Sequence, residues 1–284
     1  MSNIINGTEI AKIIKDEIKK DIENLQGKKP CLAVIILGND DASHIYVNNK
    51  NKACDYVGIK TDTYFLDDSI SEVELLSLIE ELNDDTSVNG ILVQLPLPKH
   101  INEKNILFKI NPLKDVDGFH PYNIGLLSTN SATLKSCTPS GCMEILKRYN
   151  VEIKGKNALV IGRSNIVGKP ISMMLLNEDA TVTTAHTKTK DLEYLTKQAD
   201  IIIVAIGVAN FLKPHMVKEG VILIDVGINR FDGKLCGDID FSCSNKASLI
   251  TPVPGGVGPM TITMLMKNCL IAYKIQNNIN IEEN

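Results

Sequence analysis

The sequence lacks several features that would assign it at once to a class of protein. No apolar run in its 284 residues approaches the roughly 18–20 residues that a membrane-spanning helix needs. An excess of positive charge is also missing, because 30 basic and 34 acidic residues give a net charge of −4. This balance indicates no general surface for polyanions. We therefore expect a small-molecule ligand, with neither nucleic acid nor a membrane as partner.

Signals for export and for metal binding are missing too. The seven cysteines form no C-x-x-C pair and follow no regular spacing. A disulfide framework or a cysteine metal site needs such a pattern, so we expect reduced thiols, a cytoplasmic location and no metal site. The N-terminal segment MSNIINGTEIAKIIKDEIKKDIENL mixes acids with lysines and has isoleucines at helical spacing. It therefore predicts an amphipathic helix rather than a signal or transit peptide.

The sequence does contain a regular alternation of strand-like and helix-like segments. Helical patterns, for example at 71–82 and 167–178, separate the strand-like runs. Continuous apolar strands separated by helices are typical of a parallel sheet covered on both faces, so we predict an α/β fold throughout. The strand-like runs span residues 31–38, 61–66, 90–97, 157–162, 180–185, 201–207 and 221–227.

A stretch rich in proline, glycine and aspartate, residues 112–140, divides the chain. Three strand–helix units precede this stretch and four more strands follow it. We therefore expect two domains, residues 1–118 and residues 119–284. The last helix, roughly 259–277, is apolar, and we expect it to pack back on the first domain.

The stretch NALVIGRSNIVGKP, residues 157–170, has the order strand, tight turn and helix start. Backbone N–H groups and the helix dipole at such a start favour an anion. Gly162 and Gly168 suit the first and third roles of the dinucleotide fingerprint G-x-G-x-x-G, but Ser164 replaces the middle glycine. An ordinary strand–helix turn is therefore the alternative. A hydrolase nucleophile elbow, G-x-S-x-G, is excluded because Ile166 stands in its fifth position.

The end of the next strand indicates which cofactor such a turn would bind. An NAD site usually has an acidic residue there, which binds the ribose 2′-hydroxyl. Here the strand ends at Ala185 and continues into His186, Thr187 and Lys188, with no acid. A hydroxyl, an imidazole and a cation, with Arg163 across the turn, suit a 2′-phosphate, so the sequence predicts NADP. The alternative for Lys188 is an ordinary solvated charge.

The segment DDASHIYVNNKNKAC, residues 40–54, carries a candidate reactive pair. Tyr46 and Lys50 are four residues apart and share one face if the segment is helical. A phenol beside an amine can tune a proton donor or acceptor, and burial lowers the pKa of a lysine. The alternative is a helix with an apolar tyrosine and a solvated lysine. The Y-x-x-x-K of short-chain dehydrogenases differs, because it follows the glycine-rich turn within the same domain.

Three further stretches place polar groups where α/β proteins bind ligands. Gln94 follows an apolar strand in GILVQLPLP, where a buried amide needs a partner or a ligand. Asp115 and Asp117 lie in the turn KDVDGFHP. The loop ITPVPGGVGPMT, residues 250–261, leads into the last helix with exposed N–H groups. Strand ends and helix starts of this kind commonly meet at one edge of the fold.

Together these stretches resemble the bifunctional methylenetetrahydrofolate dehydrogenase/methenyltetrahydrofolate cyclohydrolase family. The resemblance implies an N-terminal α/β catalytic domain that binds folate, a C-terminal Rossmann-like parallel sheet that binds NADP, and a cleft between them. It also implies a homodimer. The matching stretches run in order from about residue 37 to residue 265: the segment of Tyr46 and Lys50, GILVQLPLP, KDVDGFHPYN, TPSG, VIGRSNIVGKP, DVGIN and PVPGGVGPMT.

The resemblance also implies roles for single residues. Lys50 would be the central catalytic group, with Tyr46 and Gln94 setting its position and protonation, while Asp117 would hold the pterin ring. The family often has serine where Thr187 stands, and because the hydroxyl is kept we expect 2′-phosphate binding to survive. The implied cofactor residues are Gly162, Arg163, Ser164, Thr187 and Ile228. The implied substrate-binding residues are Tyr46, Asp117, Pro254 and Gly255.

The implied activity has two steps. A hydride leaves 5,10-methylenetetrahydrofolate for NADP⁺, and the methenyl product is then hydrolysed to 10-formyltetrahydrofolate with Lys50 mediating proton transfer. One rival is another two-domain NADP dehydrogenase, acting on a hydroxy acid or a shikimate-like substrate, which has no use for Gln94 or Asp117. The other is a non-catalytic NADP-binding sensor or scaffold, which the absence of Lys50 or Asp117 would have favoured.

Overall fold

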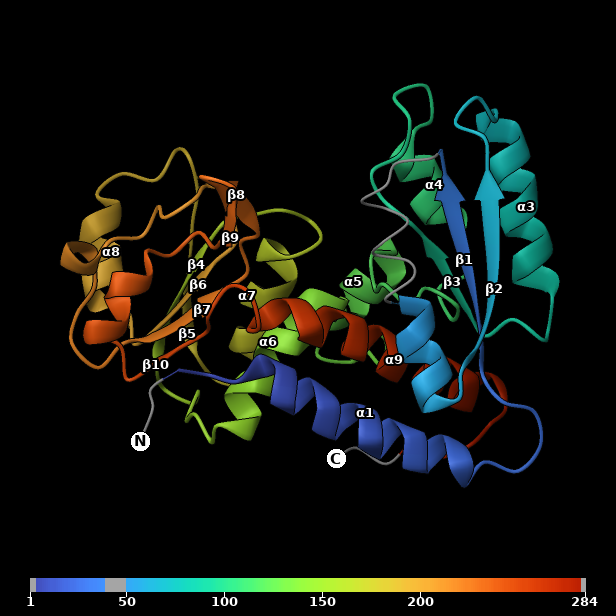
Figure 1. Ribbon diagram of the computed structural model, residues 1–284, viewed down its shortest axis with the longest axis horizontal. Helices are drawn as coiled ribbons and strands as arrows, with labels where there is room; N and C mark the ends of the chain where they lie inside the picture. Colours follow the sequence, from blue (N-terminus) through green and yellow to red (C-terminus); the bar gives the residue numbers. More distant parts are fainter. Residues whose placement is uncertain (1–3, 39–49, 282–284) are drawn as a thin grey trace. The chain divides into compact units, whose positions relative to one another are not determined.

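The computed structural model describes residues 4–38 and 50–281 (Figure 1). The chain forms two compact units, each made of two separate stretches of the sequence. Unit 1 comprises the described residues of Met1–Lys12 and Thr138–Thr261, and unit 2 those of Ile13–Cys137 and Ile262–Asn284. Residues 119–137 therefore belong to the same compact unit as the N-terminal sheet. The division into functional domains at residues 118 and 119 stays a prediction.

Helices make up a large part of both units. Among the described residues, no helix is long and apolar enough to cross a membrane. Residues 50–57 are also helical. The remaining helices are α1 (Gly7–Glu23), α3 (Glu72–Asp84), α4 (Glu103–Lys109), α5 (Pro121–Ser128), α6 (Cys137–Arg148), α7 (Gly168–Asn177), α8 (Leu192–Gln198) and α9 (Val257–Gln276), with 3-10 turns η1 (Pro214–Met216) and η2 (Phe241–Asn245).

Unit 2 contains a parallel sheet of three strands in the order β2-β1-β3. The strands are β1 (Cys31–Leu37), β2 (Lys60–Leu66) and β3 (Gly90–Val93). Helices α3 and α4 cover one face, where Leu75, Ile79 and Ile106 pack with Ala33 and Ile35 (Figure 1). The alternate β1 residues are buried as well, which is why this strand reads as a continuous apolar run.

Unit 1 contains a parallel sheet of five strands in the order β10-β7-β6-β4-β5. Its strands are β4 (Asn157–Ile161), β5 (Thr181–Ala185), β6 (Ile201–Val204), β7 (Ile222–Asp225) and β10 (Leu249–Ile250). The chain leaves β4 toward β5 on one side and returns to β6 on the other, so the direction of winding changes between β4 and β6. Open α/β sheets bind ligands outside the carboxyl ends of the strands at such a point.

The structure confirms the α/β architecture and shows where the sequence expectations differ in detail. All seven expected strands form, but β3, β6 and β7 end two to four residues earlier than expected. The residues after these shorter strands lie in loops. In the loop after β3, Gln94 accepts a hydrogen bond from Lys50, and in the loop after β6, Gly207 donates one to Asp238. An antiparallel hairpin of β8 (Asn229–Phe231) and β9 (Lys234–Cys236) was not predicted, nor was β10, because each strand is too short to show a period.

Candidate functional site

Lys50 and Gln94 are hydrogen-bonded in unit 2. The side chain of Lys50 is buried at the start of helical residues 50–57, and its Nζ donates to Oε1 of Gln94 at 3.0 Å. Gln94 follows β3, and its Nε2 donates to the Leu95 carbonyl oxygen at 2.8 Å, which turns its own oxygen toward the lysine. Tyr46, expected to assist Lys50, lies outside the described residues.

The electrostatic partner of Lys50 is Asp117. Burial lowers the pKa of Lys50, and the nearby Asp117 opposes that shift. Burial raises the pKa of Asp117 to about 6, an effect that Lys50 opposes and Asp115 reinforces. The pKa of the amine is thus lowered and that of the carboxyl group raised, a perturbation typical of groups that transfer protons.

The turn that carries Asp117 is held from several sides. The buried Asp115 accepts hydrogen bonds from three backbone N–H groups of the following turn and from an asparagine side chain. Ser136 Oγ donates to the Gly118 carbonyl oxygen at 2.9 Å. Asn268 of α9 donates to the carbonyl oxygen of residue 116 at 2.8 Å. Asp117 therefore extends from a fixed backbone, whereas Asp115 is consumed in building the turn.

The glycine turn after β4 shows what the serine does. Gly162 has φ +125°, and a Cβ there would overlap the Ala205 carbonyl oxygen; a Cβ on Gly168 would overlap the turn itself. Ser164 Oγ accepts from the N–H of Gly168 at 3.2 Å and from the preceding N–H at 3.1 Å. Ser164 thus satisfies N–H groups at the start of α7. Arg163 and Ser164 are both exposed.

The turn after β5 is adjacent to the glycine turn. Gly162 N donates to the Ala185 carbonyl oxygen at 2.9 Å, which ties the two strand ends together. The next turn is closed by His186, whose Nδ1 accepts from the N–H of Lys188 at 3.1 Å. Thr187 and Lys188 are exposed. Neighbouring strand ends thus carry a guanidinium, a hydroxyl and an ammonium group without a carboxylate among them.

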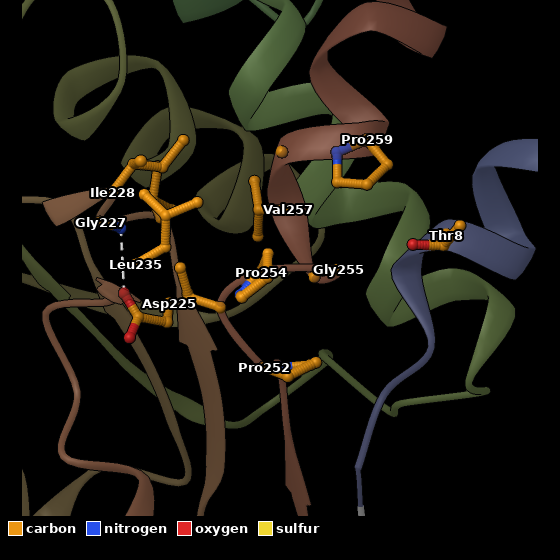
Figure 2. Close-up of a pocket in the computed structure, with 14 residues that line it drawn as sticks. Thr8, Asp225, Gly227, Ile228, Leu235, Pro252, Pro254, Gly255, Val257 and Pro259 are labelled. Carbon is orange, nitrogen blue, oxygen red and sulfur yellow. Dashed lines mark hydrogen bonds between the residues drawn. The ribbon is translucent and has the colours of Figure 1, made fainter. Parts of the chain in front are cut away.

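A pocket of about 450 Å³ lies in unit 1 at the carboxyl ends of β7 and β10. Ile228, expected to bind the cofactor, and Pro254 and Gly255, expected to bind the substrate, all line it. Figure 2 shows Ile228 and Leu235 together on the side of the pocket where Asp225 lies, with Pro254 and Gly255 on the loop beside them. The lining is mostly apolar, as is common in pockets that bind small molecules.

Asp225 and Asp238 are buried polar groups that the sequence analysis did not single out. Asp225 ends β7, and its carboxylate accepts hydrogen bonds from the backbone N–H groups of Gly227 and Asp238. Burial raises the pKa of Asp225 to about 6. The signal for Asp225 was present in the sequence, because it ends an apolar strand just as Gln94 follows one.

Six of the seven cysteines lie in buried surroundings. All seven are free thiols. Burial raises the pKa of Cys31, Cys54 and Cys142 to about 12, so these thiols stay protonated and are poor nucleophiles. Within residues 4–38 and 50–281, no group of three or more His, Cys, Asp or Glu side chains could hold a metal ion.

Comparison with known proteins agrees with this geometry. The family model for the catalytic domain of tetrahydrofolate dehydrogenase/cyclohydrolase matches residues 5–117. The model for the NAD(P)-binding domain of the same family matches residues 136–277. The chain is 55% identical over 278 residues to the bifunctional protein FolD of Agathobacter rectalis, covering 96% of this chain and 100% of that protein.

Solved structures give the same result. The bifunctional enzyme FolD, methylenetetrahydrofolate dehydrogenase/cyclohydrolase, from Campylobacter jejuni superposes with a TM-score of 0.94 at 52% identity, covering 96% of this chain and 98% of that one. The FolD of Trypanosoma brucei, complexed with NADP cofactor and an inhibitor, gives a TM-score of 0.90 at 36% identity, with coverage of 96% and 97%. This chain belongs to the tetrahydrofolate dehydrogenase/cyclohydrolase family.

Proposed function

We propose that the protein oxidises 5,10-methylenetetrahydrofolate to 5,10-methenyltetrahydrofolate with NADP⁺ and hydrolyses that product to 10-formyltetrahydrofolate. The observation that carries this proposal is the buried Lys50 amine, hydrogen-bonded to Gln94 and electrostatically coupled to Asp117. These three residues fall in or directly beside the segments that resemble the family. The names of relatives more than half identical to this chain support both activities.

The oxidation depends on positioning. NADP⁺, when bound, supplies the hydride acceptor, and the protein has to hold two flat rings in contact. The exposed Arg163, Thr187 and Lys188 fit a 2′-phosphate, because they offer two cations and a hydroxyl and include no carboxylate. Gly162 and Ser164 shape the turn at the start of α7, and Ile228 supplies an apolar contact in the pocket. No protein nucleophile is required for this step.

The hydrolysis depends on Lys50. A neutral Lys50 amine accepts a proton from the water that attacks the methenyl carbon. The resulting ammonium then donates a proton to the pterin nitrogen as its bond to that carbon breaks, and the hydroxyl proton leaves to solvent. Gln94 Oε1 accepts a hydrogen bond from Nζ and so orients the amine. Asp117 accepts hydrogen bonds from pterin N–H groups. For Tyr46, Pro254 and Gly255, substrate binding stays what the resemblance to the family implies.

The proposal extends to organisation and location. Residues 1–118 form the catalytic, folate-binding domain, and residues 119–284 form the NADP-binding domain, with the last helix packed on the first. The protein acts in the cytoplasm as a homodimer. Strand β5 supports a homodimer because it pairs only with β4 at the edge of the described five-stranded sheet, with Thr181, Thr183 and Thr184 exposed.

The test follows two products at once. The purified protein is mixed with NADP⁺ and 5,10-methylenetetrahydrofolate, and the absorbances of NADPH and of the methenyl species are followed separately. We expect NADPH to appear without accumulation of the methenyl species. In Lys50→Met the methenyl species should accumulate while NADP⁺ still binds. The matched control is Lys52→Met, an exposed lysine of the same helical segment, which should behave like the wild type.

Two results would contradict the proposal at different points. Normal hydrolysis by Lys50→Met would show that another group mediates proton transfer. No NADPH from a wild-type protein that binds NADP⁺ would show that the substrate is not 5,10-methylenetetrahydrofolate.

A further inference from the structure

Asp238 is a buried carboxylate that the reaction described above does not use. Its side chain is fully buried in unit 1, two residues after the end of β9. Oδ2 accepts hydrogen bonds from the backbone N–H groups of Ile206 at 2.7 Å and Gly207 at 3.0 Å. Oδ1 accepts from Nδ2 of Asn229 at 2.9 Å. Asp238 therefore joins the loop after β6 to the segment after β7.

Both segments adjoin residues proposed to hold NADP⁺. The loop after β6 packs against Gly162, where a Cβ would overlap the Ala205 carbonyl oxygen. Asn229, on the other side, directly follows Ile228, which lines the pocket. These loops follow strands β6 and β7, and the glycine turn follows β4, so all three lie at the ligand-binding edge of the sheet. The carboxylate of Asp238 thus sets the spacing between two parts of one site.

Asp238 is itself held in place by Asp225. Asp225 accepts hydrogen bonds from the backbone N–H of Asp238 at 2.9 Å and of Ile239 at 2.8 Å. Each carboxylate packs against a glycine next to the other segment. A Cβ on Gly227 would overlap Asp238, and a Cβ on Gly237 would overlap Asp225. Among the described residues no ion pair involves either aspartate, so hydrogen-bond donors alone offset the burial of both groups.

We propose that Asp238 is a positioning residue for the NADP⁺ site, holding the loop of residues 205–207 and the segment of Ile228 and Asn229 at the separation that the cofactor requires. This inference rests on the proposed function. Asp238 acts through the backbone of these segments. Without its carboxylate, the N–H groups of Ile206 and Gly207 lose their acceptor, and binding NADP⁺ must then order the loop as well.

The test compares two variants of Asp238 that differ in the number of acceptor oxygens that the side chain keeps. Asp238→Ala removes every acceptor and should weaken NADP⁺ binding about tenfold or more, the effect of losing at least one hydrogen bond to a charged group. Asp238→Asn keeps one oxygen for Ile206 and Gly207, and Asn229 can rotate its amide to accept from the new NH₂ group. Asp238→Asn should therefore regain most of the affinity.

The readouts separate cofactor positioning from loss of stability. The dissociation constant of NADP⁺ is measured by calorimetry, alongside the KM for 5,10-methylenetetrahydrofolate and the hydrolysis of methenyltetrahydrofolate supplied without NADP⁺. In Asp238→Ala the dissociation constant of NADP⁺ should rise, while the KM for 5,10-methylenetetrahydrofolate and the rate of hydrolysis should stay unchanged. The control is Asp240→Ala, which removes the cap of η2 two residues away. It should lower the melting temperature and leave NADP⁺ binding unchanged.

The following outcomes support or refute the inference. Wild-type affinity for NADP⁺ in Asp238→Ala, or an equal loss for NADP⁺ and folate, would overturn the inference. If Asp238→Ala does not fold, Asn229→Ala, which removes one arm of the network, decides: a few-fold loss for NADP⁺ alone supports the inference, and no loss refutes it. Failure of the wild-type protein to bind NADP⁺ would instead refute the proposed function together with this inference.

Discussion

Replacing Asp117 with asparagine should stabilise the protein at alkaline pH while it impairs folate binding. Asp117 is partly buried, and burial raises the pKa of its carboxyl group from 3.8 to about 6. The folded protein therefore binds this proton more tightly than the unfolded chain does. Ionising Asp117 costs stability, and asparagine avoids that cost because it stays neutral and has nearly the same shape.

The magnitude follows from the shift. A rise of about two pKa units at 1.36 kcal/mol per unit corresponds to about 3 kcal/mol. The stability contributed by this raised pKa is fully present below about pH 4 and is lost as the pH rises through 6. The advantage of Asp117→Asn over the wild type should therefore approach about 3 kcal/mol at about pH 8 and shrink as the pH falls toward 4.

The assay is urea unfolding of both proteins across this pH range, with Asp55→Asn, an exposed carboxylate of the same unit, as the control. Activity is measured on the same samples. We expect the KM for 5,10-methylenetetrahydrofolate to rise about tenfold or more, because the pterin N–H groups lose a charged acceptor, while NADP⁺ affinity stays unchanged. Higher stability together with weaker folate binding is the result expected if Asp117 serves function at a cost in stability.

Either of two results would refute the reasoning. An advantage of the same size at about pH 4 and about pH 8 would show that ionisation of Asp117 does not carry the cost. An unchanged KM would show that the carboxylate does not contact the substrate, although the stability argument would survive.

Two further predictions concern other parts of the chain. Arg163→Ala should weaken NADP⁺ by about tenfold or more and NAD⁺ far less, because only NADP⁺ carries the 2′-phosphate; equal losses in a titration with both cofactors would exclude Arg163 as its reader. Lys114→Met should lower the free energy of unfolding by about 3 kcal/mol, since the buried Nζ donates to three carbonyl oxygens at the end of α3. A change below about 1 kcal/mol in urea unfolding would contradict this account of Lys114.

Much of the fold could be predicted because the sequence pattern matches the local structure closely. Most of the N-terminal isoleucines at helical spacing form the buried face of α1, where Ile10, Ile14 and Ile18 are at most 6% exposed. Ile13, which shares the pattern, is 45% exposed. The most apolar runs became strands that are buried along nearly their whole length, as in β1, β3 and β6. The prediction failed for β8, β9 and β10, whose pairing depends on neighbouring segments rather than on a period of their own.

The candidate site was predicted in part. Gln94 was singled out as a buried amide in need of a partner, and the structure supplies Lys50, which is 44 residues away. Ser164 departs from the glycine fingerprint, and its hydroxyl oxygen accepts hydrogen bonds from two N–H groups at the start of α7. Asp238 was missed, because its neighbours along the chain give no sign that it bonds to the loop after β6.

The sequence by itself determined the order of strands and helices, the turns that need glycine, and the residue types of the candidate site. These depend on periodicity, backbone freedom and side-chain chemistry, which act within a few residues. Only the tertiary structure decided which polar groups meet. The pairing of Asp238 with Ile206 spans 32 residues. Contacts of that kind depend on strand order and packing, because a buried carboxylate is tolerated only where the fold brings donors to it.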